Sequence, residues 1–200
     1  MQLKRNYYKE MESILQTLGD KKERLLLHAC CAPCSSAVLE YLTRHFDITL
    51  FYYNPNIHPE EEYFKRAGEL PKLLMCAGME DVGLIVSEYD PGEFFAAAEG
   101  LESEPEGGAR CEKCFDLRLS KTAQAAAENG FDYFATTLTV SPHKNAPLIN
   151  SIGELLSAQY GIPWLPSDFK KRDGYLRSIR LCQEYGIYRQ CWCGCAFSAN

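Results

Sequence analysis

Short apolar runs alternate with longer amphipathic stretches along almost the whole chain. Runs rich in leucine, β-branched and aromatic residues indicate buried strands, and apolar residues spaced three and four apart indicate helices. Strands are expected at residues 25–29, 48–53, 82–86, 133–137 and 162–165. Helices are expected at residues 4–18, 35–42, 59–77, 94–98, 111–128, 145–160 and 174–184.

Local signals predict where several of these helices begin and end. Ser35 or Ser36 is expected to cap the second helix, and Asn145 is expected to cap the sixth. Pro59 suits the first turn of the third helix, where its missing N–H costs no hydrogen bond. Gly78 is a suitable residue to stop that helix.

Strands that alternate with helices predict an α/β fold with a parallel sheet covered on both faces. Right-handed crossovers and short connections favour a doubly wound, Rossmann-like order. In such sheets, ligands bind beyond the carboxyl ends of the strands. The loops at residues 30–34, 54–58, 139–145 and 166–168 follow four of the predicted strands, so we expect them to meet at one sheet edge.

Composition predicts one intracellular domain. The 200 residues are 46% hydrophobic and show no internal repeat or low-complexity linker, so a single domain over residues 1–200 is expected. Residues 1–20 lack the continuous apolar core of a signal peptide, and no later run is long enough to span a bilayer. We therefore expect a cytoplasmic protein without a membrane partner, in a compartment that keeps thiols reduced.

Charge is distributed unevenly along the chain. The net charge is −6, but residues 166–200 hold six Lys and Arg against three Asp and Glu, which gives this segment +3 and the other residues −9. A basic, cysteine-rich C-terminal segment packed on the sheet edge would steer phosphate to one face of the molecule. The alternative interpretation is an ordinary solvated helix surface.

Ten cysteines supply the clearest chemical signal. Only Cys76, which we expect in a helix core, and Cys182 stand alone. Clustering favours metal ligation or thiol redox chemistry over structural disulfides, because neighbouring cysteines rarely reach disulfide geometry. The three groups are Cys30, Cys31 and Cys34; Cys111 and Cys114; and Cys191, Cys193 and Cys195.

The first two groups suit a metal centre. The turn at residues 28–35 contains no glycine, which disfavours binding of a dinucleotide or ATP there. Thiolates in this turn would lie at a helix N-terminus, whose partial positive charge stabilises anions. Cys111 and Cys114, about one helical turn apart, add two ligands. Four thiolates fit either structural zinc or an iron–sulfur cluster, and the spacing does not distinguish them.

The third group differs from the other two in its spacing. Cys193 and Cys195 are separated only by Gly194, and a disulfide closed over one residue would be strained and therefore easily reduced. We favour a redox pair on this ground. The competing interpretation is that one of these cysteines ligates the metal.

Several longer segments together resemble the epoxyqueuosine reductase family QueH. They occur in that family's order over nearly the whole chain, and in combination they are highly specific. The segments are HACCAPCS, FYYNPNIHP, EYFKR, RCEKCFDLRL, TTLTVSPHKN, PSDFKKRDGY and YRQCWCGCAFS.

The resemblance implies a fold, a cofactor and a redox pair. The fold would be similar to that of the adenine nucleotide alpha-hydrolases. A [4Fe–4S] cluster would be held by Cys30, Cys31, Cys111 and Cys114, with a redox-active disulfide at Cys193 and Cys195. Some relatives have an acid near the first turn and a further metal. Cys34 would then bind a second metal ion or replace one of the four ligands.

The resemblance also implies a reaction, the reduction of epoxyqueuosine to queuosine at the wobble position of tRNA. Opening the epoxide to an alkene and water consumes two electrons and two protons, and the electron donor is not identified by the sequence. Candidate proton donors are Asp168, His143, His58 and Tyr53. Expected tRNA contacts are Lys144, Lys170, Lys171 and Arg172 to phosphate, and Tyr53 and Trp192 to a splayed base.

Two other functions remain open at this point. In the first, the cysteine groups bind zinc as the scaffold of a non-catalytic nucleic-acid-binding module. In the second, the chain is a tRNA-thiolating enzyme of the PP-loop type. That enzyme needs a glycine- and serine-rich phosphate loop after the first strand, which residues 30–34 do not provide.

Overall fold

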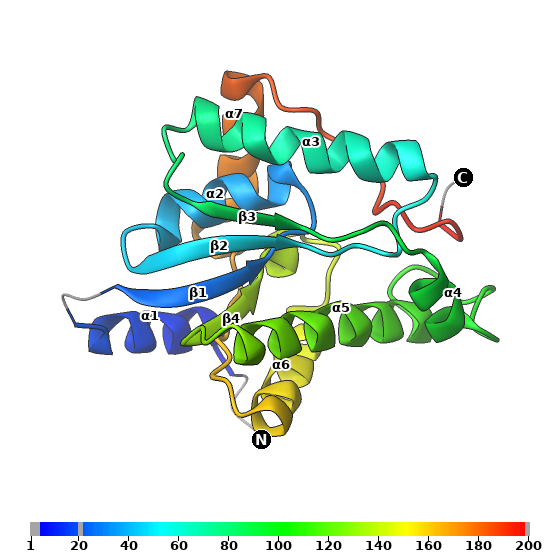
Figure 1. The fold of residues 1–200 in the computed structure, drawn as a ribbon, viewed down its shortest axis with the longest axis horizontal. Helices are drawn as coiled ribbons and strands as arrows, with labels where there is room; N and C mark the ends of the chain where they lie inside the picture. Colours follow the sequence, from blue (N-terminus) through cyan, green and yellow to red (C-terminus); the bar gives the residue numbers. More distant parts are fainter. Residues whose placement is uncertain (1–4, 20–21, 199–200) are drawn as a thin grey trace.

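The computed structural model describes residues 5–19 and 22–198 and has a parallel sheet at its centre (Figure 1). Within these residues the sheet has four strands in the order β3–β2–β1–β4, all parallel. In register, Leu25 lies opposite Ile48 on one side and Tyr133 on the other. The strands are β1 (Glu23–His28), β2 (Phe46–Tyr52), β3 (Gly83–Val86) and β4 (Tyr133–Thr136).

Helices cover both faces of this sheet (Figure 1). Leu25 and Leu27 face one hydrophobic core, which α2, α3 and α7 complete, and Leu26 faces a second core under α5 and α6. This alternation along one strand confirms the predicted doubly wound arrangement. The helices are α1 (Tyr7–Thr17), α2 (Ala32–Leu42), α3 (Glu60–Cys76), α4 (Gly92–Ala98), α5 (Ala109–Glu128), α6 (Ala146–Tyr160) and α7 (Gly174–Tyr185).

The predicted fifth strand, residues 162–165, is reduced to one isolated bridge between Trp164 and Phe134. The Phe134 amide donates to the Pro163 carbonyl and the Leu165 amide donates to the Phe134 carbonyl, each at 3.0 Å. Pro163 has no N–H to donate toward β4, and the Ser167 amide donates to Asn150 Oδ1 at 2.9 Å instead of to β4, so the ladder ends at this bridge.

All seven predicted helices are present, but several begin or end at other residues than predicted. The predicted serine cap is wrong: α2 begins at Ala32, because Pro33 fits the first turn, and Ser35 and Ser36 lie inside the helix. The sixth helix is capped as predicted, since the Asn145 side chain accepts from the Leu148 amide. The first helix spans Tyr7–Thr17, and the predicted start at residue 4 lies outside the described residues.

Cys76 is exposed at the end of α3, so the expectation of a helix-core thiol was wrong. Cys182 of α7 is the buried one of the two isolated cysteines. In the described part of the chain, no helix is long and apolar enough to cross a bilayer.

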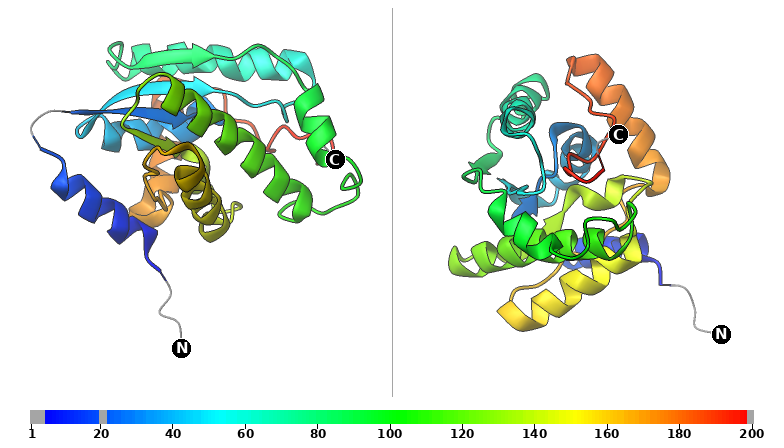
Figure 2. Two further views of the ribbon diagram at one scale, coloured as in Figure 1. Left: turned by 60° about the horizontal axis from the view of Figure 1, so that its bottom comes forward. Right: turned by 90° about the vertical axis from the view of Figure 1, so that its right-hand side faces the viewer.

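The C-terminal segment after α7 (red in Figure 2) folds back onto the loop that follows β2. Cys195 forms an antiparallel bridge with Ile57, and the His58 amide donates to the Gly194 carbonyl at 2.9 Å. Arg66 of α3 donates to the Cys193 carbonyl at 3.1 Å. These contacts hold the third cysteine group next to the carboxyl ends of the strands.

Candidate metal and redox site

A cavity of about 500 Å³ lies beyond the carboxyl ends of β1 and β4. Its wall combines the turn after β1, the loop after β4, side chains of α3, α5 and α7, and residues 189–193 of the C-terminal segment. Two of the four loops expected to meet at this edge line the cavity: Cys30 and Cys34 after β1, with Val140, Ser141, His143 and Lys144 after β4. The other two contact these loops without lining it, since Asn54 donates to the Ala29 carbonyl at 2.9 Å and the Ser167 and Thr139 hydroxyls are 2.9 Å apart.

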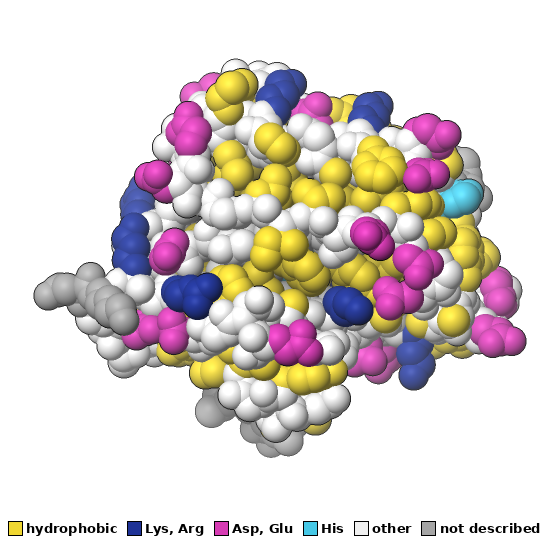
Figure 3. Space-filling model, in the orientation of Figure 1, with side chains coloured by type: hydrophobic (Ala, Val, Ile, Leu, Met, Phe, Trp, Pro, Cys, Tyr) yellow, Lys and Arg dark blue, Asp and Glu magenta, His cyan; other side chains and the backbone are white. Residues whose placement is uncertain are grey.

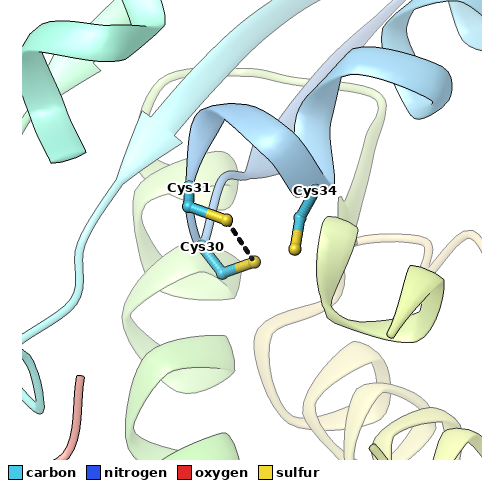
Figure 4. A group of neighbouring side chains, drawn as sticks. All are labelled: Cys30, Cys31 and Cys34. Carbon is cyan, nitrogen blue, oxygen red and sulfur yellow. Dashed lines mark hydrogen bonds between the residues drawn. The ribbon is translucent and has the colours of Figure 1, made fainter. Parts of the chain in front are cut away.

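The first cysteine group forms a compact cluster of three thiols. The Sγ atoms of Cys30, Cys31 and Cys34 all lie within 4.8 Å of one another, and the Cys30 and Cys31 sulfurs are 3.8 Å apart (Figure 4). Thr137 fixes this turn against the end of β4, because its hydroxyl accepts from the Cys30 amide at 3.2 Å and donates to the Cys30 sulfur at 3.4 Å. Three thiols at this separation can share one metal ion.

The three thiols do not share protons equally. Hydrogen bonds from Cys31 and Cys34, together with the positive charge of Arg118, hold the pKa of Cys30 well below its ordinary value. The hydrogen bond to Cys30 raises the pKa of Cys31, and hydrogen bonds to Cys30 and Cys31 raise that of Cys34. The cluster therefore favours one thiolate stabilised by two thiols, which is a starting state for metal binding.

The second group, Cys111 and Cys114, lies in the first turns of α5, and neither residue lines the cavity. Cys111 accepts from the Gly107 amide at 3.2 Å. Cys114 is buried, which raises its pKa, and it packs in one apolar cluster with Cys195 and Cys193. Neither thiol joins the compact trio of the first group among the described residues. Cys114 of the second group thus packs with the third group rather than with the first.

Arg118 connects the cysteine groups. It is buried, with Nη2 donating to Asn54 Oδ1 at 2.5 Å and Nη1 lying 3.8 Å from Cys114 Sγ. In the described part of the chain no carboxylate lies within ion-pair distance of it. Burial opposes its charge, but Cys114, Cys30 and Cys193 outweigh burial and raise the pKa of Arg118.

A buried cation without a carboxylate requires another anion nearby. The thiolates of three cysteine groups are the candidates, and a metal–thiolate centre is the form in which several thiolates carry negative charge together. The donor set around Arg118 therefore fits an anionic metal–sulfur centre.

The third group holds two unequal thiols. Cys193 and Cys195 are free cysteines in this structure. A hydrogen bond from Cys195, aided by the positive charge of Lys144, lowers the pKa of Cys193 to about 5, and the same bond raises the pKa of Cys195. One partially exposed thiolate beside one buried thiol is the arrangement that suits thiol–disulfide exchange.

Several predicted catalytic or RNA-binding side chains lie away from this cavity. Asp168 forms an ion pair with Lys170 at 2.8 Å, and neither residue lines the cavity. Lys171 and Arg172 line a separate cavity of about 300 Å³. His58 is exposed on the loop after β2.

The prediction that Tyr53 stacks on a base is not supported by its surroundings. Its ring is 4% exposed and packs parallel to Phe51, and its hydroxyl donates to Glu93. Lys144, His143 and Trp192, in contrast, all line the cavity. Strand alternation alone could not show that both Tyr52 and Tyr53 would be covered, because one is buried within the sheet and the other under α4 and α5.

Three buried polar residues behind the thiols, Arg118, His28 and Asn54, were not predicted from the sequence. Arg118 follows Cys111 by two helical turns and Cys114 by one, so its place on their helix face was a readable signal. His28 and Asn54 gave no such signal. His28 is fully buried at the end of β1, where burial and then the charge of Arg118 lower its pKa to about 3.

The chain matches one known protein family over most of its length. A family model described as "Epoxyqueuosine reductase QueH" matches residues 25–200. A protein of that name from Streptococcus pyogenes serotype M1 is 47% identical over 98% of this chain and 78% of its own. One from Staphylococcus epidermidis is 46% identical over 97% of this chain and 84% of its own. One from Thermotoga maritima is 38% identical over 87% of this chain and 89% of its own.

Proposed function

The chain belongs to the epoxyqueuosine reductase QueH family, and we propose that it reduces epoxyqueuosine to queuosine at the wobble position of tRNA. This makes it an oxidoreductase whose macromolecular partner is tRNA. The observation that supports this chemistry best is the buried Arg118 in the cavity wall, whose pKa is raised by thiols of all three cysteine groups. Because the substrate is tRNA, we expect the protein to act in the cytoplasm.

The metal centre of this proposal is a [4Fe–4S] cluster. Cys30, Cys31, Cys111 and Cys114 would hold it, with Cys34 available to a further metal ion beside the first pair. Such a cluster, when bound, supplies single electrons and a Lewis-acidic iron. The helix N-terminus at Ala32 and the Arg118 guanidinium would stabilise its negative charge.

Cys193 and Cys195 would act as the redox pair. As a dithiol they can give up two electrons and two protons and become a disulfide, which matches the two electrons that the epoxide consumes. The depressed pKa of Cys193 supplies the thiolate that begins such an exchange. An external reductant would then restore the dithiol, and its identity stays open.

The cavity size favours a single extruded nucleoside as the bound part of the tRNA. About 500 Å³ is within the range of small-molecule sites and too small for a duplex. Trp192 in the wall, in cation–π contact with Arg66 at 5.2 Å, offers an aromatic side chain for a splayed base. The wobble nucleoside would enter alone, with the rest of the anticodon loop outside.

The test is conversion of epoxyqueuosine-containing tRNA by anaerobically reconstituted protein with dithionite as reductant. Digestion of the tRNA and mass analysis of its nucleosides should show queuosine, one oxygen atom lighter than its precursor. A scaffold that binds zinc alone would give a colourless protein that leaves the nucleoside unchanged. A thiolating enzyme would require ATP and add sulfur.

Serine variants separate the redox pair from the metal ligands. Cys193→Ser and Cys195→Ser should each keep the iron content and visible spectrum of the wild type but stop turnover when a thiol reductant is the only electron source. Loss of iron in either variant would instead make that residue a ligand.

A further inference from the structure

Among the described residues, Lys144 is the one lysine in the cavity wall, which it shares with Arg66, Arg118 and Arg189. The Lys144 side chain is 13% exposed, and its Nζ is 2.9 Å from Glu106 Oε1. Burial works against its charge, but the Cys193 thiolate and the Glu106 carboxylate outweigh burial and raise the pKa of Lys144. The ammonium group is therefore protonated at neutral pH and lies near the third cysteine group.

Neighbouring elements keep this lysine in place. Glu106 lies on the loop before α5, and the buried Arg110 organises that loop by donating from Nη1 to the carbonyls of Leu101, Glu102 and Glu104. The Lys144 amide in turn donates to the Ser141 carbonyl at 3.3 Å. Both partners of the ion pair thus have a fixed backbone.

Other candidate acids are less well placed. Asp168 is paired with Lys170 away from the cavity, the Tyr53 hydroxyl is engaged by Glu93, and His58 is exposed elsewhere. Of the four proton donors expected from the sequence, His143 is the one that lines the wall, and it is exposed. Lys144, in contrast, is largely buried in the cavity wall, is protonated, and lies near Cys193.

We propose that Lys144 is the catalytic acid that protonates the epoxide oxygen, an inference that rests on the proposed function. As one electron pair enters from the reductant and the first C–O bond breaks, the N–H bond of the ammonium breaks and an O–H bond forms. The second C–O bond then breaks to form the alkene, and a second proton from solvent completes water. The net change is one epoxide, two electrons and two protons to one alkene and one water.

An alkoxide is a much stronger base than a lysine amine, so this transfer is favourable even with a raised pKa. Before the proton is transferred, the Lys144 ammonium also stabilises the negative charge that develops on the epoxide oxygen. This role differs from a phosphate contact, which would change binding of tRNA and leave the chemical step unaltered.

Three substitutions in the reconstituted full chain distinguish these roles. Lys144→Arg keeps the positive charge but cannot give up a proton, Lys144→Met removes both, and Lys144→Ala leaves room for a small amine. With dithionite as reductant, each should lower kcat by about 10²–10⁴-fold, the usual contribution of a general acid, with Kd for tRNA and iron per chain unchanged. Ethylammonium should partly restore kcat in Lys144→Ala only.

Lys9→Met, on the exposed face of α1, is the matched control and should retain full activity. A Lys144→Arg variant with wild-type kcat would overturn the proposal, as would a Lys144→Met defect confined to Kd. Loss of iron in these variants would assign Lys144 to support of the metal centre instead. If the wild-type protein forms no queuosine, the proposed function itself is wrong. If the wild type and the Lys144 variants are equally active, only the role of Lys144 is wrong.

Discussion

At the scale of residues, the site is organised by buried charge more than by the cysteines alone. Arg118 has no carboxylate partner in the described chain and is surrounded by thiols of all three groups. A buried cation of this kind is tolerated only where anions accompany it. The guanidinium therefore favours thiolates, and with them a bound metal, over neutral thiols.

Removing this charge should weaken metal binding. Arg118→Gln should lose most of its bound iron after anaerobic reconstitution, and Arg118→Lys, which keeps the positive charge, should lose less. Iron per chain measures the effect, and circular dichroism of the metal-free variants checks that the fold is kept. Wild-type iron content in Arg118→Gln would contradict this account of the charge.

The buried His28 predicts a pH dependence of stability. The folded state keeps its ring neutral, with a pKa near 3, while the unfolded chain protonates histidine below the ordinary value of 6.5. The contribution of His28 to the free energy of unfolding is therefore full above pH 6.5 and is lost progressively as the pH falls below that value. From pH 7 to pH 5.5, linkage gives a loss of about 1 kcal/mol from this residue.

Denaturant unfolding of reduced, metal-free protein at both pH values should show this difference. The loss on acidification should be about 1 kcal/mol larger in the wild type than in His28→Gln. Equal losses in the two proteins would mean that His28 is already protonated in the folded state.

At the scale of elements, α3 and the loop after β2 anchor the C-terminal segment. Gly194 has a φ of +95°, and a Cβ there would meet Ile57 Cγ1 at 2.9 Å and Arg66 Nη1 at 3.0 Å. In the sequence, Gly194 is simply the one residue between Cys193 and Cys195. The structure gives a reason for a glycine there, since this residue needs both the left-handed conformation and a close approach to its neighbours.

Gly194→Ala should therefore displace the segment that carries the redox pair. The buried Cys195 should react with iodoacetamide faster than in the wild type, and turnover should fall while the overall fold stays intact. Gly78→Ala is the control, because Gly78 also has a positive φ but has no atom within 4 Å of an added Cβ. Unchanged reactivity of Cys195 in Gly194→Ala would show that the segment accommodates the extra methyl group.

The core strands and most helices were predictable because apolar spacing is a local property of the chain. Residues 162–165 were not, because whether an apolar run becomes a strand depends on which N–H groups face the neighbouring strand. Pro163 has none, and the Ser167 amide donates to Asn150. Lys144 and Tyr53 were assigned by residue type, and only burial could show that one enters the cavity and the other does not.

At the scale of the whole molecule, the acidic body and the reactive cavity are separate surfaces. The face shown in Figure 3 carries acidic and apolar side chains, with a group of acidic ones near α4. Phosphates would be repelled there. The cavity wall on the strand ends instead contains Arg66, Lys144 and Arg189, so tRNA is expected to approach from that side.

The central claim is that cysteines from separate parts of this fold hold one iron–sulfur centre at the cavity. The direct measurement is iron and sulfide per chain, with the visible spectrum, in anaerobically reconstituted wild type, Cys111→Ser and Cys76→Ser. The account predicts a brown wild type, loss of most iron and sulfide in Cys111→Ser, and wild-type content in Cys76→Ser, whose thiol is exposed at the end of α3. Equal iron and sulfide in Cys111→Ser and the wild type would contradict it.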